Sequence, residues 1–511
     1  MSQPHPVGID LGTTWCAVAH IDQWGRSAIV RNAEGNILTP SVVLFDGDEI
    51  IVGEEARKAV GLESGKIAEC AKRDMGKRQY SNAVGGKTYP PEVIQAYILG
   101  KLKHDTVKAL GGEIQAVITV PAYFDDSRRK ATADAGQMAG IDVLDIVNEP
   151  TAAALAYGES LGFLADGMAP AEPMTVLVYD LGGGTFDVTV IKLQPGEFSN
   201  LATDGDFRLG GRDWDERLAR FAAEDFRRRF AADPLESPES FSRLMHAAEE
   251  AKRTLSRRER AVIRFAHAGR AHDVPVTRDQ FTEMTVDLLD RTAFTTRQAL
   301  KSAKLDWSDL SAVLLVGGSS NMPAVFKMLS NMSDVPPLQI PNPDESVARG
   351  AALFARHKAG STQSRSSLEV VDVSSHSLGM VAWDRQTGRD KNVIMIPRHS
   401  ELPAEHVHHY RLLEDNARRL VIQVEEGELE DLNACLPIGK AVVRNLPENL
   451  PKGTRVQVTF RYATNGRLTV LAQIAGMPQQ LAVELQRDGG LSDEEVGKWT
   501  EVVTEHLRPM A

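Results

Sequence analysis

The first 360 residues alternate between short apolar runs and longer stretches with helical spacing. Residues 176–179 and 313–316 are wholly apolar and lead into glycine turns, a pattern typical of strands buried on both faces of a sheet. Residues 127–140 and 280–303 instead space their apolar positions as one face of a helix does. This mixture predicts an α/β architecture for the first part of the chain.

A polar stretch separates this part from a β-rich second part. Residues 358–367 read KAGSTQSRSS and cannot bury much apolar area, so they predict a linker. Beyond the linker, residues 420–424, 455–462 and 467–474 have the composition of strands, and the Asn-Gly pair at 465–466 predicts a two-residue hairpin turn. The second part is therefore expected to be mostly sheet.

A short helix is expected at the end of the chain. Ser492 and Glu495 have the spacing of a capping box, in which each side chain bonds to the other residue's backbone N–H. Val496, Trp499 and Val503 follow on one helical face.

Composition narrows the class of protein. Of the 511 residues, 42% are apolar and 25% are charged, as in ordinary globular proteins. The formal net charge of −12 argues against a sequence-independent nucleic-acid binder, which would carry a basic face. Cys16, Cys70 and Cys435 are too few for a disulfide framework and are expected to be reduced thiols. The start shows no signal-peptide pattern and no run of about 18 apolar residues occurs, so we expect a cytoplasmic protein without a membrane partner.

The first part also repeats itself. Residues 7–14 (VGIDLGTT) recur as residues 178–185 (VYDLGGGT), each a strand, an aspartate, a glycine turn and a threonine. Such a duplication suggests two similar lobes that face one ligand. The glycines let backbone N–H groups converge on an anion. Asp10 and Asp180 would repel a phosphate alone, so they make sense with a bridging cation, most simply Mg²⁺.

Two further features concern this chemistry. Asp187 adds a third hard oxygen ligand, and Gly317-Gly318-Ser319 forms a third glycine turn after the strand at 313–316. The segment GGKT at 85–88 resembles the end of a Walker A loop. It lacks the required first glycine and a preceding strand, so we interpret it as a surface turn.

These turns, in this order, resemble the actin-like ATPase superfamily, and the surrounding motifs are similar to those of the DnaK-type heat shock protein 70 chaperones. The resemblance covers nearly the whole chain. It is carried by IDLGTT at 9–14, TVPAYF at 119–124, NEPTAAA at 148–154, DLGGGTFD at 180–187 and EEAKRTLS at 249–256.

The resemblance implies a fold and a domain organisation. The fold would be a two-lobed actin-like ATPase domain, a duplicated ribonuclease H-like unit, followed by a β-sandwich peptide-binding domain and a short C-terminal helix. The implied boundaries are 1–360 for the nucleotide-binding ATPase domain, 361–373 for the linker, 374–490 for the sandwich and 491–511 for a helix stub without a lid.

The resemblance also implies roles at a site for ATP or ADP. Lys72 would place its charge on the β- and γ-phosphates, Glu149 would orient the attacking water, and Thr185 would approach the γ-phosphate. Asp10, Asp180 and Asp187 would hold Mg²⁺ and monovalent cations such as K⁺, mostly through water. The residues expected around the nucleotide are Gly12, Thr13, Thr14, Trp15, Gly182, Gly183, Gly184, Gly210, Gly211, Glu249, Lys252, Arg253, Ser256, Gly317, Gly318, Ser319 and Asp344.

In the second part, the resemblance implies a groove for extended, unfolded polypeptide, bound through backbone hydrogen bonds and an apolar pocket. The matching positions are Met380, Trp383, Tyr410, Leu413, Leu420 and Ile422. His406, His408 and His409 lie among these strands without an evident fourth ligand for a metal, so we expect solvent-facing histidines.

Four departures from the family pattern bear on function. Asn321 stands where the family has an arginine that stacks on adenine, which predicts a several-fold loss of nucleotide affinity. Asp145 reverses the charge that the family presents to J-domain co-chaperones, which predicts poor J-domain recruitment. Glu369 interrupts the apolar linker, which predicts weaker coupling between domains. The chain also ends where the family's helical lid begins, which predicts fast peptide exchange.

Three functions remain open on these observations. The leading one is an ATP-dependent chaperone in which hydrolysis in the first part controls the grip of the second on polypeptide, with a nucleotide exchange factor as a possible partner. A non-hydrolysing or uncoupled regulator of the same family is the first alternative, because of Asn321 and Asp145. A small-molecule kinase on the actin-like fold is the second, but such a kinase would lack a β-rich unit after a polar linker.

Overall fold

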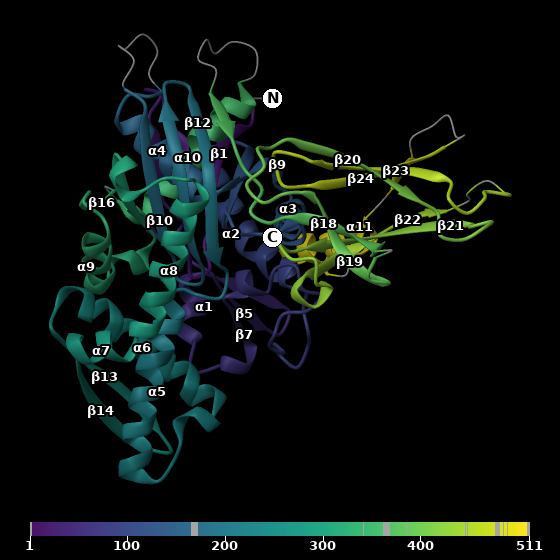
Figure 1. The fold of residues 1–511 in the computed structure, drawn as a ribbon. Helices are drawn as coiled ribbons and strands as arrows, with labels where there is room; N and C mark the ends of the chain where they lie inside the picture. Colours follow the sequence, from purple (N-terminus) through teal and green to yellow (C-terminus); the bar gives the residue numbers. More distant parts are fainter. Residues whose placement is uncertain are drawn as a thin grey trace.

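The computed structural model describes residues 3–164, 172–340, 342–360, 368–384, 386–444, 446, 448–475, 481–483, 485–487 and 489–507. Figure 1 shows a large α/β part, coloured purple to green, with a β-rich part in green and yellow beside it. The predicted mixture of an α/β unit, a β-rich unit and a last helix is confirmed. Residues 361–367 of the expected linker lie outside the described residues.

The first lobe is built on a sheet of order β3-β2-β1-β8-β9, with β4 paired to β2. Its strands β1 and β2 form an antiparallel hairpin, and β8 and β9 extend the sheet in parallel. A second small sheet of order β6-β5-β7 belongs to the same lobe. The strands are β1 (His5–Leu11), β2 (Trp15–Ile21), β3 (Ser27–Val30), β4 (Thr39–Pro40), β5 (Val42–Asp46), β6 (Glu49–Val52), β7 (Ile67–Glu69), β8 (Ile114–Val120) and β9 (Asp142–Asn148). The helices are α1 (Glu54–Ala59), α2 (Pro91–Leu110), α3 (Asp126–Met138) and α4 (Glu149–Ser160).

The second lobe repeats this plan. Its sheet has the order β16-β15-β10-β11-β12-β17, again with an antiparallel hairpin (β10–β11) beside a parallel strand (β15). The predicted strands at 176–179 and 313–316 are confirmed within β10 and β15. The strands are β10 (Met174–Leu181), β11 (Phe186–Gln194), β12 (Glu197–Asp206), β13 (Arg260–His267), β14 (Arg270–Thr277), β15 (Ala312–Val316), β16 (Pro337–Gln339) and β17 (Glu369–Val371). The helices are α5 (Gly211–Phe230), α6 (Pro238–Arg257), α7 (Arg278–Met284), α8 (Val286–Ser302), α9 (Pro323–Met332) and α10 (Pro343–Ala359).

The helical segment predicted at 280–303 is two helices. Thr285 separates α7 from α8 with non-helical φ and ψ of −122° and 12°. Its hydroxyl donates a hydrogen bond of 2.8 Å to the carbonyl of Phe281, a local bond that competes with regular helix geometry. The helical pattern of apolar residues continues across the break, so periodicity alone could not reveal it. The other predicted helix, at 127–140, is confirmed as α3.

Successive residues of β1 point to opposite faces of the first sheet, so one face packs on helices of the first lobe and the other on α10, which lies between the lobes. In β1, Val7, Ile9 and Leu11 join the core beneath α2 and α3, whereas Gly8 faces α10. A Cβ at Gly8 would collide with the α10 backbone at Ala351 and Ala352, so glycine permits the close approach. Helix α10 also packs against α4, and together they separate the two sheets (Figure 1).

The β-rich part contains two sheets that enclose a single core, a sandwich. One sheet has the order β19-β18-β21-β22-β26 and the other β20-β23-β24-β25. The strands are β18 (Leu378–Asp384), β19 (Arg389–Ile396), β20 (Ala404–Arg411), β21 (Arg419–Glu426), β22 (Leu436–Arg444), β23 (Arg455–Tyr462), β24 (Leu468–Ile474), β25 (Leu481–Val483) and β26 (Leu485–Arg487). His406, His408 and His409 are exposed on β20, as predicted.

The hairpin predicted at 465–466 is confirmed in place but not in length. Strands β23 and β24 pair up to Tyr462 and Leu468, and the N–H of Ala463 donates to the carbonyl of Arg467 over 3.0 Å. Residues 464–466 therefore form a three-residue loop. Gly466 closes that loop with φ of 75°, which matches a type I turn followed by a left-handed residue.

The residues that connect the two parts are joined to the second lobe. Strand β17 pairs in parallel with β12, so residues 369–371 become the edge strand of the second sheet. Glu369 is exposed, while Leu368 and Val370 pack against the core shared by α4 and α10. The charge that interrupts the apolar linker therefore points away from the docked face.

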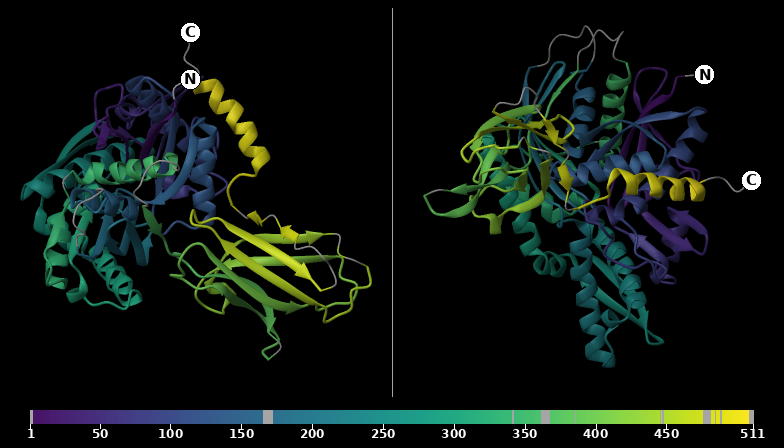
Figure 2. Two further views of the ribbon diagram at one scale, coloured as in Figure 1. Left: turned by 90° about the horizontal axis from the view of Figure 1, so that it is seen from above. Right: turned by 90° about the vertical axis from the view of Figure 1, so that its right-hand side faces the viewer.

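The last helix, α11 (Asp493–Leu507), lies on the first lobe and not on the sandwich (Figure 2, right). The predicted capping box is present, with the Ser492 N–H donating to Glu495 over 2.8 Å. The predicted apolar face of Val496, Trp499 and Val503 joins the core beneath α2 and α3. His506 contacts the Tyr97 hydroxyl at 2.8 Å.

Other features of the sequence have plain structural outcomes. The segment at 85–88 is an exposed turn in which Val84 bridges Lys87. The three cysteines are free thiols. Within the described ranges, no helix combines the length and apolar character needed to cross a membrane.

The packing of α11 predicts a difference between two adjacent valines. Val503 is fully buried, whereas Val502 is 37% exposed. Val503→Ala should lower the free energy of unfolding by about 2 kcal/mol through lost burial and the cavity left behind. Val502→Ala, the matched control, should change it by less than about 0.5 kcal/mol. Urea unfolding measures both, and equal effects would contradict the docking of α11.

Glu92, in the first turn of α2, predicts a pH dependence of stability. It is fully buried, and neither carboxylate oxygen has a partner among the described residues. Burial raises the pKa of Glu92 to about 7. Between the ordinary glutamate pKa of about 4.3 and this value, the folded state binds more protons than the unfolded state, so stability falls as pH rises, by at most about 1.4 kcal/mol per unit.

Glu92→Gln should remove this slope and stabilise the protein at pH 8. Glu494→Gln, at an exposed site on α11, serves as control. Thermal or urea unfolding between pH 5 and pH 8 gives the comparison, and an unchanged slope in Glu92→Gln would assign the pH dependence to other groups.

Candidate functional site

A cavity of about 1240 Å³ lies in the cleft between the lobes, and both duplicated hairpins open onto it. The turn after β1 supplies Asp10, Gly12, Thr13 and Thr14, and the turn after β10 supplies Asp180, Gly182, Gly183 and Thr185. The third turn, Gly317-Gly318-Ser319, closes the same cavity. The three turns predicted to approach one ligand therefore converge.

The turns touch one another where glycine is required. A Cβ at Gly183 would overlap the Thr14 side chain, and one at Gly184 would overlap Thr13. Gly317 adopts φ of 80° and lies against the Asp180 carboxylate, a conformation that favours glycine. The result is a cradle of backbone N–H groups and threonine hydroxyls, which suits an anion such as a phosphate chain.

A cluster of charges lies behind this cradle. Lys72 is 2% exposed, forms an ion pair with Glu149, and donates a 2.5 Å hydrogen bond to the carbonyl of Leu11. Asp187 accepts a 3.0 Å hydrogen bond from the backbone N–H of Tyr123. Glu149, Asp180 and Asp187, which are buried, and Asp10, which is partly buried, thus place four carboxylates around one ammonium group.

Burial shifts the pKa values in this cluster. Burial and the charge of Glu149 raise the pKa of Asp10 to about 7 and that of Asp187 to about 8. The same causes raise the pKa of Asp180 well above its ordinary value. Burial alone would lower the pKa of Lys72, but the charges of Glu149 and Asp10 raise it instead. The cluster therefore carries more negative charge than its surroundings stabilise.

A divalent cation fits this donor set. Hard carboxylate oxygens are the ligands that Mg²⁺ prefers, and added positive charge would offset the repulsion. In the described part of the chain, no three His, Cys, Asp or Glu side chains stand close enough to ligate a metal directly.

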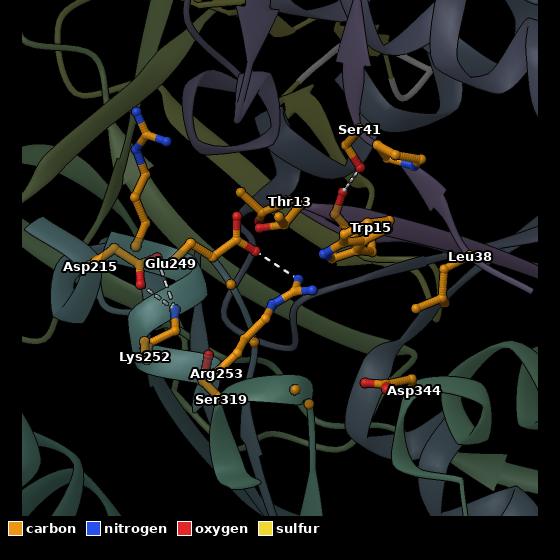
Figure 3. Close-up of a pocket in the computed structure, with 18 of the residues that line it drawn as sticks. Thr13, Trp15, Leu38, Ser41, Asp215, Glu249, Lys252, Arg253, Ser319 and Asp344 are labelled. Carbon is orange, nitrogen blue, oxygen red and sulfur yellow. Dashed lines mark hydrogen bonds and ion pairs between the residues drawn. The ribbon is translucent and has the colours of Figure 1, made fainter. Parts of the chain in front are cut away.

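The far end of the cavity is lined by helix α6 and the start of α10. The Arg253 guanidinium donates to Glu249 over 2.7 Å, and Figure 3 shows it lying between Glu249 and Trp15. Lys252 donates to Asp215 over 2.8 Å and to the Gly211 carbonyl over 2.9 Å. Ser256 and Asp344 also line this end.

Most residues predicted for the nucleotide site line this single cavity. Those outside its lining are Asp187, Gly184, Gly210 and Gly211, which lie directly behind it. The predicted residues that line it are Asp10, Gly12, Thr13, Thr14, Trp15, Lys72, Glu149, Asp180, Gly182, Gly183, Thr185, Glu249, Lys252, Arg253, Ser256, Gly317, Gly318, Ser319 and Asp344.

Other lining residues were missed by sequence reasoning. Arg57, on α1 of the first lobe, reaches across the cleft to Glu249 at 3.4 Å and Glu250 at 3.8 Å. Asp215 holds Lys252, and Arg212 pairs with Glu69 at 2.9 Å. No motif marks these residues, because each is identified only by a partner that is distant in sequence.

Asn321 and Asp145, the two residues that differ from the family pattern in this part, each have defined side-chain partners. The Asn321 amide donates to the Gly318 carbonyl over 3.1 Å and accepts from Gln339 over 2.5 Å. Asparagine therefore places a neutral, hydrogen-bonded side chain at this edge of the cavity. Asp145 forms an ion pair of 2.7 Å with Lys358.

The residues predicted for a peptide groove divide into two groups. Trp383 and Leu413 are 49% and 53% exposed, and Tyr410 and Leu420 are partly buried. Met380 and Ile422 belong to the sandwich core, at 6% and 0% exposure. Of the exposed members, Trp383 lies on β18 and Leu413 lies in the segment that follows β20.

A polar network connects the start of the sandwich domain to the cleft. Asp372, which follows β17, accepts hydrogen bonds of 2.5 Å from Asn148 and 2.7 Å from Asn200. Asn148 directly precedes Glu149 and also accepts from Arg129 at 2.5 Å. The backbone N–H of Tyr123 holds Asp187, and its ring makes an edge-to-face contact with His376 of the sandwich, with centroids 4.1 Å apart.

Comparison with known proteins identifies the family. A family model described as "Hsp70 protein" matches residues 6–85 and 79–508. "Chaperone protein DnaK" of Halobacterium salinarum, strain ATCC 29341 / DSM 671 / R1, is 36% identical over 514 aligned positions that cover 99% of this chain and 79% of the relative. The protein of the same name from strain ATCC 700922 / JCM 11081 / NRC-1 gives the same values.

The buried carboxylates predict opposite effects of one substitution on the free and liganded protein. Asp180→Asn removes a buried, repelled charge and should stabilise the ligand-free protein by about 1–3 kcal/mol. The same variant should lose most of the rise in melting temperature that Mg²⁺ with ATP or ADP gives the unmodified protein. Asp334→Asn, at an exposed position, is the control. Thermal unfolding with and without Mg²⁺ and nucleotide tests both effects, and retained stabilisation by the nucleotide would remove Asp180 from the site.

Proposed function

The chain belongs to the Hsp70 family, and on that premise we propose that this ATP-dependent chaperone hydrolyses ATP in the cleft to control how tightly the β-sandwich holds extended polypeptide. The single observation that carries the proposal is the cluster of four carboxylates around Lys72, three of them buried and one partly buried, placed behind three converging glycine turns. Such a concentration of carboxylates is costly without a bound cation, and a cation held there would attract an anionic ligand.

The location of each residue in the cleft suggests the role that we propose for it. Mg²⁺ would neutralise charge on the phosphates, and Asp10, Asp180 and Asp187 would hold it, with K⁺ as a further candidate. The cradle of Gly12, Gly182 and Gly183 would bind phosphate oxygens through backbone N–H groups. Lys72 would place its ammonium on the phosphate chain, because its charge is held by Glu149 at the edge of the cavity.

Glu149 is the residue suited to orient a water molecule. It lies at the first turn of α4, with Lys72 fixing its carboxylate. Thr185 would donate its hydroxyl toward the terminal phosphate. Excluding bulk water from this buried cluster strengthens each of these interactions.

Coupling to the sandwich would pass through two contacts next to these groups. Asp372 bonds to Asn148, the neighbour of Glu149, and Tyr123 joins Asp187 to His376. Closure of the cleft on a nucleotide would favour or disfavour this docked arrangement, and so change the access of peptide to the exposed face near Trp383 and Leu413.

The binding partner we propose is unfolded or extended polypeptide. The printed name of the relatives, a chaperone, supports this, as does the exposure of apolar side chains on both sheets of the sandwich. The ion pair of Asp145 with Lys358 supports poor recruitment of a J-domain, because the acidic residue is held at the surface beside the linker. A nucleotide exchange factor is a further proposed partner.

One observation favours a second function. Asn321 presents no cation to a base, which would weaken nucleotide binding and leave a family member that binds polypeptide without turnover. A small-molecule kinase is not favoured, because the chain carries a β-sandwich that such a kinase would lack.

ATP hydrolysis tests the two functions. The unmodified chain should hydrolyse ATP slowly and respond to an unfolded peptide with a rate increase of several-fold. Lys72→Ala should lower the rate by about 10²-fold or more. Asp372→Ala should leave the basal rate nearly unchanged and abolish the response to peptide, because it breaks the contacts to Asn148 and Asn200.

Glu369→Gln, an exposed change in strand β17, which directly precedes Asp372, is the control for Asp372→Ala. Intact ATP after hours with the unmodified chain would favour the non-hydrolysing regulator. Hydrolysis whose rate does not respond to peptide would contradict the proposed coupling between domains but would still support the proposed ATPase activity.

A further inference from the structure

Trp15, the first residue of β2, lies against two guanidinium groups in the cleft. The Arg57 guanidinium carbon lies 4.4 Å from its ring centroid and that of Arg253 lies 5.3 Å away. Arg57 comes from α1 in the first lobe and Arg253 from α6 in the second. Figure 3 shows the Arg253 side chain extending from α6 toward the Trp15 ring.

The two guanidinium groups are brought together by one carboxylate. Glu249 contacts Arg253 at 2.7 Å and Arg57 at 3.4 Å. Burial opposes ionisation here, but the charges of Arg253, Lys252 and Arg57 lower the pKa of Glu249. Glu249 thus stays charged and offsets the repulsion between the arginines, while the electron-rich face of Trp15 offers both a favourable contact.

The neighbourhood of Arg253 shows what this arrangement is for. Asn321, which also lines the cavity, is neutral, and its side-chain amide is hydrogen-bonded to Gly318 and Gln339. Lys252 is held by Asp215 and the Gly211 carbonyl. The Arg253 guanidinium, which pairs with Glu249, is a planar cation that lies beside Trp15 and lines the same cavity.

We propose that Trp15 is a positioning residue for the purine base, which holds the Arg253 guanidinium at the angle at which a base can stack on it. The inference rests on the proposed ATP site and goes beyond it, because it assigns base recognition to a tryptophan at the phosphate end of the cleft. An arginine on α6 would otherwise sample many rotamers, and fixing one of them in advance removes an entropic cost of binding. The stack offsets the absence of a cation at Asn321.

The chemistry separates two classes of ligand. A purine nucleotide uses both the phosphate cradle and the stacked guanidinium, whereas inorganic tripolyphosphate uses the cradle alone. Loss of the Trp15 ring should therefore weaken ATP but not tripolyphosphate. A merely structural role for Trp15, which adjoins the first phosphate turn, would weaken both ligands together.

The test compares Trp15→Leu, which keeps apolar bulk without an aromatic face, with Trp15→Phe, which keeps the face. With Mg²⁺ present, Trp15→Leu should raise the Kd of the full chain for ATP about tenfold and leave that for tripolyphosphate within about twofold. Trp15→Phe should stay within about threefold of the unmodified chain for both ligands. The KM for ATP should follow the Kd, with kcat unchanged.

Two further variants complete the design. Arg253→Ala should weaken ATP as Trp15→Leu does, and the double variant should show no added loss, since the two residues act as one unit. Trp24→Leu, at a tryptophan that is 69% exposed, is the control and should change nothing.

The outcomes are distinct. Equal losses for ATP and tripolyphosphate in Trp15→Leu, equal effects of Trp15→Leu and Trp15→Phe, or additive losses in the double variant would each overturn the role of Trp15. Failure of the unmodified chain to bind ATP at all would instead overturn the proposed function.

Discussion

Four carboxylates and one ammonium group, all buried except the partly buried Asp10, are gathered in a single cleft and constrain the whole molecule. Asp10, Glu149, Asp180 and Asp187 come from both lobes, and Lys72 is the cation that they enclose. Bringing these groups out of water is costly, and like charges at short range add to that cost. The fold therefore holds the site in a strained electrostatic state that a cation and an anionic ligand would relieve, and the surrounding structure must be rigid enough to keep it so.

Two features make this arrangement rigid: the duplicated strand plan of the lobes and the small residues that let α4 and α10 pack closely. Each lobe places an antiparallel hairpin beside a parallel strand, so each aspartate stands at the same point of its sheet. Helices α4 and α10 fill the space between the sheets and approach closely at Gly350, where a Cβ would overlap the Ala152 backbone. A relative movement of the lobes must therefore change the spacing of the carboxylates, which gives nucleotide binding a mechanical consequence.

Among the described residues, contacts of several kinds join the second part of the chain to the first. Strand β17 extends the second sheet, α11 covers the first lobe, and the sandwich contacts Tyr123 and Asp126 between them. These contacts gather around the residues that hold Asp187 and precede Glu149. The linker charge at Glu369, which suggested weak coupling, points to solvent, and the docked strand uses Leu368 and Val370 instead.

The sequence by itself determined the parts whose signals are local. Wholly apolar runs that lead into glycine turns specified β10 and β15, the Ser492–Glu495 pair specified the start of α11, and the repeated aspartate turns specified which carboxylates belong together. Local patterns could not determine the break at Thr285 or the three-residue loop at 464–466, because the same periodicity and the same Asn-Gly pair allow more than one backbone path. Only the tertiary structure decided that the apolar face of α11 packs on the first lobe, that Arg57 and Asp215 line the cleft, and that Met380 and Ile422 belong to the sandwich core. Each of these features depends on which surface a residue packs against in the fold. Burial and charge pairing between segments that are far apart in the sequence produce no pattern in the local sequence of either segment.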